Sequence, residues 1–387
     1  MQSAQEILST LVSFPVLGGQ SNLSIIDWIK KYLEEYEVSY HLVPHPEEAK
    51  TSLHCRIGPA VDGGVILSGH TDVVPVAGQD WTSEPFELTE KEEKLYARGS
   101  CDMKGFLACC LACLPDMLAA DLKKPIYFAF SYDEEIGCLA APALVAAINK
   151  TYLEKPKYAI IGEPTMMQPV VGQKGICIYK VTVHGSAGHS SRIKQEVSAI
   201  HEAARLIMWL EDKMETLIAA GHTDDRFTPN HTSIHIGTIQ GGIAPNVIAD
   251  KCVFHWDVRV IPQDSVREVA AEFETYCRER EAILKSKFAG FKIENVEHHP
   301  PVPPLNTPEH LSVVDLIKVL SENDQLQTVA YAAEAGQFAE GGFESVICGP
   351  GSILQAHRAD EFIAKEQLDK GVAFVRRLIK NLSVEPL

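Results

Sequence analysis

The 387-residue sequence lacks any apolar run long enough to span a membrane. It is also short of basic charge, because 35 lysines and arginines stand against 52 aspartates and glutamates, giving a net charge of −17. A nucleic-acid surface needs a basic stripe, so this balance argues against that class of protein. The first six residues contain neither a basic segment nor an apolar core, so no secretion signal is predicted. We expect no nucleic-acid partner and no membrane association.

The ten cysteines lack the regular spacing of a disulfide framework. Three of them, Cys109, Cys110 and Cys113, lie in an apolar run that predicts a helix, and we interpret them as core thiols. Free thiols without a secretion signal indicate a reducing compartment, so the predicted localisation is cytoplasmic. The length suffices for one large domain or two ordinary ones.

Several short apolar runs end in polar residues, which is typical of buried strands in an α/β sheet. Residues 65–68, 126–131, 158–164 and 345–349 are such runs, and helical patterns lie between them. Ligands of open α/β sheets bind where strands end. The residues that follow these runs are therefore the candidate site.

A different pattern begins near Gly175, where residues 176–184 alternate between apolar and polar. The order strand, helix, strand, strand, helix, strand continues to residue 297 and predicts a small α+β domain. A proline-rich connector at 299–304 leads back to the first pattern. We predict a domain of residues 1–176 and 299–387, interrupted by an inserted domain of residues 177–298.

Potential metal ligands lie at or beyond the ends of these four runs and of a short strand predicted over residues 95–98. Carboxylates gathered at one sheet edge repel one another, so we expect cations to offset their charge. Imidazole and carboxylate ligands together suit Zn²⁺, Co²⁺ or Mn²⁺, and a shared carboxylate can hold two such ions about 3.5–4 Å apart. The candidates are His70, Asp102, Glu134 with Glu135, Glu163 and His357.

Each of these motifs also has a plainer interpretation. The Asp72 carboxylate can accept the free ring N–H of a metal-bound His70, but the pair could equally be a solvated strand end. Glu134 and Glu135 point in different directions in extended chain, so one can bind metal while the other acts as a general base. An exposed acidic turn is the alternative. Asp102 precedes a predicted helix, where a capping aspartate is common.

Further turns supply candidate substrate contacts. His189 lies in a Gly/Ser-rich turn, Asn246 lies in a second turn, and Arg259 ends a strand. Such groups can stabilise an oxyanion or bind a carboxylate, although each is more often a turn residue or a solvated charge. The backbone N–H groups of residues 349–352 could bind an anion, and a plain tight turn is the alternative.

Five motifs, taken in order, resemble the di-zinc family of acetylornithine deacetylase, succinyl-diaminopimelate desuccinylase and their peptidase relatives. They span nearly the whole chain and comprise residues 68–75, 99–105, 133–137, 162–165 and 356–357. The resemblance implies an α/β fold, with a mixed-sheet zinc-exopeptidase-like catalytic domain and an inserted ferredoxin-like lid that forms a homodimer. It also implies two divalent metal ions, zinc first and cobalt as the alternative.

The resemblance assigns a role to each candidate residue. The implied metal ligands are His70 and Glu163 for one ion, Glu135 and His357 for the other, and Asp102 as the bridge. The implied catalytic residues are Glu134 as general acid/base, Asp72 as the partner of His70, and His189 as the oxyanion donor in the partner subunit's site. The implied substrate contacts are Asn246, Arg259, Glu334, Gly349, Gly351 and Ser352.

Segments 81–86, 334–338 and 348–362 are most similar to the acetylornithine deacetylase branch. This similarity implies hydrolysis of N2-acetyl-L-ornithine, a small-molecule substrate, to L-ornithine and acetate in arginine biosynthesis. Two alternatives stay open: another acyl-amino-acid amidohydrolase or dipeptidase of the family, and a non-catalytic metal- or metabolite-binding module. The family has a short Pro- and Gly-containing turn after the His189 motif. Residues 192–196 depart from that pattern.

Overall fold

The computed structural model describes residues 2–384, and the chain divides into two compact units. The main unit comprises the chain up to Gly172, Leu305–Thr328 and the segment from Ala333 onward. The inserted unit comprises Gln173–Pro304 and Val329–Ala332.

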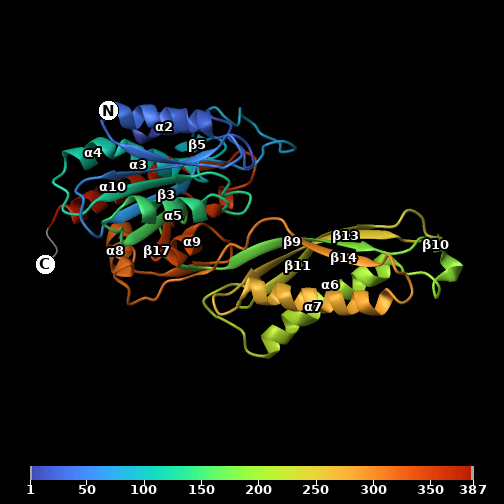
Figure 1. Ribbon diagram of the computed structural model, residues 1–387. Helices are drawn as coiled ribbons and strands as arrows, with labels where there is room; N and C mark the ends of the chain where they lie inside the picture. Colours follow the sequence, from blue (N-terminus) through green and yellow to red (C-terminus); the bar gives the residue numbers. More distant parts are fainter. Residues whose placement is uncertain (1, 385–387) are drawn as a thin grey trace. The chain divides into compact units, whose positions relative to one another are not determined.

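A nine-stranded mixed sheet forms the centre of the main unit (Figure 1). Its order is β1-β2-β6-β3-β7-β17-β8-β15, and β16 pairs with β8. Strands β6, β3, β7 and β17 are parallel neighbours, so their carboxyl ends reach the same edge. The strands are β1 (Tyr40–Pro44), β2 (Thr51–Ile57), β3 (Val65–His70), β6 (Ile126–Ser131), β7 (Tyr158–Pro164), β8 (Val170–Gln173), β15 (Leu305–Asn306), β16 (Gln327–Val329) and β17 (Glu344–Gly349).

Helices cover both faces of this sheet (Figure 1). Helix α3 packs directly on β3 and β7, with α1 and α10 against it, and α5 and α9 pack on other strands of the sheet and on each other. A smaller three-stranded sheet has the order β18-β5-β4. The helices are α1 (Ala4–Val12), α2 (Leu23–Glu35), α3 (Lys104–Ala112), α4 (Leu114–Ala119), α5 (Ala141–Thr151), α8 (Ser312–Ser321), α9 (Ala335–Glu340) and α10 (Lys365–Leu382). The small-sheet strands are β4 (Thr89–Lys91), β5 (Lys94–Tyr96) and β18 (Phe362–Ala364).

Strand β3 shows how the sheet positions a functional side chain. Val65 and Leu67 belong to the large apolar cluster that includes α3. Because side chains alternate along a strand, His70 points to the opposite face. His70 pairs in register with Ser131, the last residue of β6. The residues that follow β6 are therefore brought beside His70.

Two predicted elements differ from the observed ones. The apolar run that contains Cys109, Cys110 and Cys113, predicted as one helix, forms the two helices α3 and α4. Pro115 in the first turn of α4 explains the break, because proline cannot continue a helix ladder. The third strand of the predicted α+β domain is divided into β12 (Val247–Ile248) and β13 (Lys251–Val260). All ten cysteines are buried free thiols, as the core interpretation requires.

The inserted unit has a four-stranded antiparallel sheet of order β11-β13-β9-β14. Helices α6 and α7 pack on this sheet and join its strands in an apolar cluster. This is the α+β arrangement predicted from the alternating pattern. No helix within residues 2–384 has the length and apolar character needed to cross a membrane. The elements are β9 (Gly175–His184), β10 (Gly188–His189), α6 (Ala199–Ala219), β11 (Ser233–Gly241), α7 (Val266–Leu284) and β14 (Lys292–Glu297), with β10 paired to β12.

Candidate metal centre and active site

Five predicted ligands meet at the carboxyl edge of the parallel strands. His70 Nε2 lies 3.3 Å from Asp102 Oδ1 and 4.0 Å from Glu163 Oε1. His357 Nε2 lies 3.0 Å from Glu135 Oε2 and 3.4 Å from Asp102 Oδ2. Asp102 therefore directs one oxygen toward each imidazole, which is the geometry of a bridging ligand. Met103, not Asp102, occupies the N-cap of α3, so the capping interpretation of Asp102 is wrong.

Glu134 lies next to this set. Its Oε2 is 4.0 Å from His70 Nε2, and its Oε1 accepts a hydrogen bond from the Cys138 thiol at 3.3 Å. Ligand atoms of His70, Glu134 and Glu163 lie within 4.8 Å of one another, as do those of His70, Asp102 and Glu135. The geometry alone thus leaves Glu134 close enough either to a metal ion or to a water bound beside it.

The pairing of His70 with Asp72 is present, but the shorter contact is to the backbone. His70 Nδ1 lies 2.8 Å from the main-chain oxygen of Asp72 and 3.6 Å from its carboxylate Oδ1. The carboxylate instead accepts the main-chain N–H groups of Glu134, at 3.3 Å, and Glu135, at 3.2 Å. One aspartate thus fixes the imidazole of His70 and the backbone of both glutamates.

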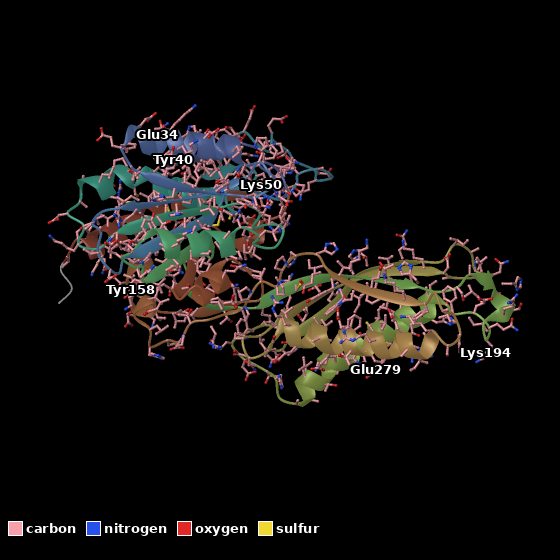
Figure 2. The ribbon with its side chains drawn as sticks, viewed as in Figure 1. Glu34, Tyr40, Lys50, Tyr158, Lys194 and Glu279 are labelled. Atoms are coloured by element: carbon pink, nitrogen blue, oxygen red, sulfur yellow. The ribbon has the colours of Figure 1, made fainter. Side chains whose placement is uncertain are left out.

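Two residues that flank or belong to the candidate site have a left-handed backbone although neither is glycine. Asp133, just before Glu134, has φ 55°, and His357 has φ 62°. Such conformations are costly and persist where surrounding contacts enforce them. Around Asp133 those contacts are Lys50 Nζ at 2.7 Å and Gly19 N–H at 2.8 Å. Lys50 is labelled in Figure 2, and its ion pair with Asp133 is buried.

Crowded negative charge characterises the centre. Burial, reinforced by neighbouring carboxylates, raises the pKa of Glu163 and Glu134 well above the usual range and that of Glu135 to about 7. Contacts with Asp102 and Glu135 raise the pKa of His357 to about 10. Although burial opposes it, hydrogen bonding to His357 and His70 lowers the pKa of Asp102.

Two buried oxygens of this centre, Glu135 Oε1 and Glu163 Oε1, find no hydrogen-bond partner within residues 2–384. Buried acceptors without partners are costly in a native protein, and a cation would satisfy them. The mixed imidazole and carboxylate donors suit Zn²⁺ and other divalent transition metals. The residues present therefore fit a pair of divalent ions.

A model of the peptidase family M20/M25/M40 matches residues 66–381. The chain belongs to this family. An acetylornithine deacetylase from Proteus mirabilis is 34% identical over 387 residues, covering 97% of this chain and 96% of its own. Another from Salmonella typhimurium is 33% identical over 92% of each chain.

Solved structures of the family share the fold. An M20 metallo-carboxypeptidase from Sulfolobus solfataricus matches with a TM-score of 0.78 at 17% identity, over 99% of this chain and 100% of its own. A dinuclear metal-binding peptidase from Bacillus subtilis matches with a TM-score of 0.64 at 16% identity, over 97% and 96%. The predicted resemblance and fold class are confirmed, and with them the prediction of a metal-binding hydrolase.

Among the predicted substrate contacts of the main unit, Glu334 is the most informative. It precedes α9, is 1% exposed, and its Oε1 has no hydrogen-bond partner within the described residues. Burial raises the pKa of Glu334 to about 7. A buried carboxyl group without a full set of partners is suited to a cationic ligand group.

The predicted anion-binding turn at residues 349–352 is not formed as expected. The N–H of Gly349 donates to Thr165 Oγ1 at 3.3 Å, and the N–H of Gly351 donates to Gln367 Oε1 at 3.2 Å. The Ser352 hydroxyl accepts the N–H of Leu354 and caps a short 3₁₀ helix. Both N–H groups are therefore already used within the protein, which favours the plain tight turn, and the substrate contacts of these glycines stay a prediction.

The inserted unit carries the remaining candidates. Nδ1 of the exposed His189 accepts the N–H of Ser191 at 3.2 Å, which leaves Nε2 as the ring's proton donor. A short 3₁₀ helix, Ser190–Arg192, follows His189. Residues 192–196, which depart from the family pattern, continue from it as a turn with an ion pair between Arg192 and Glu196. The main-chain oxygen of Asn246 accepts the N–H of Ser190.

Arg259 lies in β13 and its Nε is 3.4 Å from Asp257 Oδ1. Its Nη1 donates to the main-chain oxygen of Ala330 at 3.4 Å. Both contacts are long, so the guanidinium keeps donors for a carboxylate ligand.

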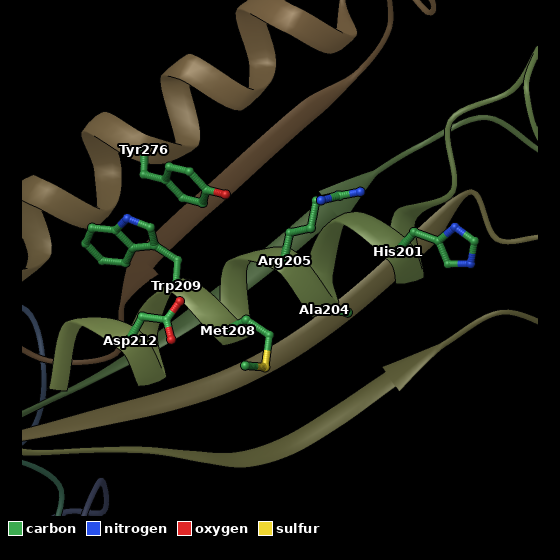
Figure 3. Close-up of a pocket in the computed structure, with 7 residues that line it drawn as sticks. All are labelled: His201, Ala204, Arg205, Met208, Trp209, Asp212 and Tyr276. Atoms are coloured by element: carbon green, nitrogen blue, oxygen red, sulfur yellow. The ribbon is translucent and has the colours of Figure 1, made fainter. Parts of the chain in front are cut away.

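A separate hollow of about 490 Å³ lies between α6 and α7 (Figure 3). Trp209 and Tyr276 stack in it, with ring centroids 5.5 Å apart. Among the described residues that line it, Asp212 is the only carboxylate and His201 the only imidazole. It therefore lacks the ligand set found in the main unit and is not the candidate site.

Sequence reasoning missed several groups that hold the centre together, which are Cys138, Lys50, Gln79, Arg98 and Glu361. Cys138 and Glu361 had one usable signal, since each lies four residues after a predicted site residue, Glu134 or His357. Arg98 directly precedes the motif of residues 99–105, whereas Lys50 and Gln79 lie outside the five motifs and gave no signal.

Proposed function

We propose that this protein hydrolyses N2-acetyl-L-ornithine to L-ornithine and acetate, using two divalent metal ions, zinc or cobalt. The observation that carries the proposal is Asp102 placed between His70 and His357, with Glu134 beside it. The proposal is also supported by the sequence, which is 34% identical to an acetylornithine deacetylase over nearly its full length.

We assign His70 and Glu163 to one ion, Glu135 and His357 to the other, and Asp102 to both. When bound, the ions supply Lewis acidity, which lowers the pKa of a water and polarises the amide carbonyl. The protein's task is to hold these ligands deprotonated and at fixed separations.

Glu134 is the proposed general acid/base. It takes a proton from the attacking water and delivers it to the departing amine. Burial raises its pKa, and a raised pKa suits a carboxyl group that must hold a proton between two steps near neutral pH. Asp72 fixes its backbone and Cys138 binds Oε1, so Oε2 is left on the side of His70.

Substrate recognition is proposed as follows. Glu334 binds the side-chain ammonium of ornithine, because its carboxyl group is buried and lacks a partner for Oε1 within the described chain. Arg259 binds the α-carboxylate, Asn246 contacts the substrate, and His189 donates from Nε2 to the oxyanion. We also propose a cytoplasmic homodimer that forms through the inserted unit and works in arginine biosynthesis.

Replacing Glu134 with Gln tests the mechanism. We expect turnover to fall by about 10²- to 10⁴-fold, because the amide cannot accept the proton. Two metal ions per chain should still bind, which metal analysis measures. Activity close to wild type would show that another group is the base.

A substrate panel tests the specificity. Metal-loaded protein is assayed on acetylornithine, succinyl-diaminopimelate and several acetyl-amino acids, with kcat/KM for each. Acetylornithine should give the highest value. A higher value for another compound would establish the alternative, a different acyl-amino-acid amidohydrolase of the family.

A further inference from the structure

The carboxylate of Glu361 lies inside the turn that carries Asp102. It is 1% exposed, and both of its oxygens are used. Oε1 accepts the N–H groups of Cys101 at 2.9 Å and of Asp102 at 3.0 Å. Oε2 accepts the N–H of Gly99 at 3.0 Å and the guanidinium of Arg98 at 2.7 Å. One carboxylate thus holds three backbone groups of the turn.

A chain of hydrogen bonds continues from Glu361 to the other side of the metal centre. Arg98 Nη2 donates to Gln79 Oε1 at 2.6 Å, and Gln79 Nε2 donates to the main-chain oxygen of His357 at 3.0 Å. The Trp81 ring lies 5.1 Å from the guanidinium and also donates its N–H to Gln79 Oε1. The network therefore begins at Asp102 and ends at His357.

The electrostatics of this network indicate that Glu361 does more than close the turn. A buried carboxylate is costly unless charge-assisted hydrogen bonds satisfy it, and Glu361 has four donors. Two of these donors are the N–H groups of Gly99 and Cys101, which precede the bridging residue in its turn, and a third is the N–H of Asp102 itself. His357, four residues before Glu361 in the chain, is restrained through Gln79. Any shift of Glu361 would move Asp102 relative to His357.

We propose that Glu361 is a positioning residue that sets the separation of Asp102 and His357 and so the affinity for the pair of divalent ions. The proposal rests on the metal centre of the proposed function. It assigns to Glu361 no contact with substrate or metal. Loss of groups that orient metal ligands typically lowers metal affinity by about 10- to 100-fold.

The test replaces Glu361 with Gln and measures Co²⁺ binding to the full-length protein. Gln has the same shape, but its amide NH₂ cannot accept the N–H groups that one carboxylate oxygen now accepts. We expect the affinity for at least one Co²⁺ to fall by about 10- to 100-fold. The visible absorption of bound Co²⁺ should change as well, and kcat should fall more than KM rises.

The matched control is Glu202→Gln. Glu202 is also a buried carboxylate paired with an arginine, Arg280, but it lies in the inserted unit. This variant should lose stability while its Co²⁺ affinity and spectrum stay as in wild type. If Glu361→Gln fails to fold, Gln79→Ala breaks the outer link of the same network, and we expect it to weaken one Co²⁺ and alter the spectrum.

Wild-type affinity and spectrum for both ions in a folded Glu361→Gln protein would overturn the positioning role and leave the proposed function intact. If Glu361→Gln does not fold, wild-type affinity and spectrum in the Gln79→Ala protein would overturn the positioning role in the same way. Failure of the wild-type protein itself to bind two Co²⁺ ions would overturn the proposed function, and the positioning role with it.

Discussion

Replacing Glu334 with Gln should stabilise the protein, and by more at high pH than at low pH. The side chain is fully buried before α9, and burial raises the pKa of Glu334 from its usual 4.5 to about 7. A raised pKa in the folded state means that, between these two values, the folded protein binds more protons at this site than the unfolded chain. The contribution of Glu334 to the free energy of unfolding is therefore fully present below about pH 4.5 and is lost as pH rises through about 7.

The size of the effect follows from the same two pKa values. Their difference corresponds to about 3 kcal/mol of stability, lost between about pH 4.5 and pH 8. Gln cannot ionise, so the variant avoids this loss. For a unit of this size, 1 kcal/mol moves the melting temperature by about 2 °C, so the variant should gain about 6 °C relative to wild type across this range.

The assay is thermal unfolding of chelator-treated protein at several pH values between 5 and 8. The control is Glu340→Gln, an exposed glutamate at the end of the same helix, for which the difference from wild type should stay constant. Bound cations favour the ionised carboxylate, so the gain should shrink in metal-loaded protein. A Glu334→Gln difference that does not change with pH would refute the assignment of a buried, protonated Glu334.

Two other predictions follow from the centre. Replacing Cys138 with Ala should lower kcat by up to about tenfold with KM unchanged, because Oε1 of Glu134 loses its donor, and Cys138→Ser should restore most of it. Steady-state kinetics of both variants test this prediction, and a kcat of Cys138→Ala equal to that of wild type would contradict it. Metal removal should lower the melting temperature more at pH 9 than at pH 6. Burial raises the pKa of Glu135 to about 7 and Asp102 raises that of His357 to about 10, so the metal-free protein loses stability as pH rises through both values. A metal-induced shift that is the same at both pH values would contradict it.

The central sheet and the gathering of the candidate ligands at one edge were predictable because both depend on local patterns. An apolar strand such as residues 126–131 shows its burial in its own composition, and in parallel strands the next polar residues fall at the same edge. His70 and Glu163 lie at the ends of such strands, and Glu135 lies just beyond one. The helix break at Pro115 was visible in the sequence but was outweighed by the apolar pattern around it.

The contacts that orient these ligands were not predictable, because they join distant segments. The N–H of Gly351 could have faced an anion, but Gln367 reaches it first. The turn at Asp102 could have been held by its own helix, but Glu361 holds it from near the end of the chain. No local pattern reports which distant side chain will satisfy a backbone donor.

Asp72 shows what this means for the chemistry. Its position two residues after His70 indicates a partner for the imidazole, and its backbone oxygen fills that role. Its carboxylate has a second task, because its two oxygens accept the N–H groups of Glu134 and Glu135. Adjacent residues fixed in this way have their side chains directed apart, so Glu135 reaches His357 while Glu134 reaches Cys138. The proposed separation of metal binding from proton transfer thus depends on a carboxylate that lies beside the candidate metal centre and has neither of these proposed roles.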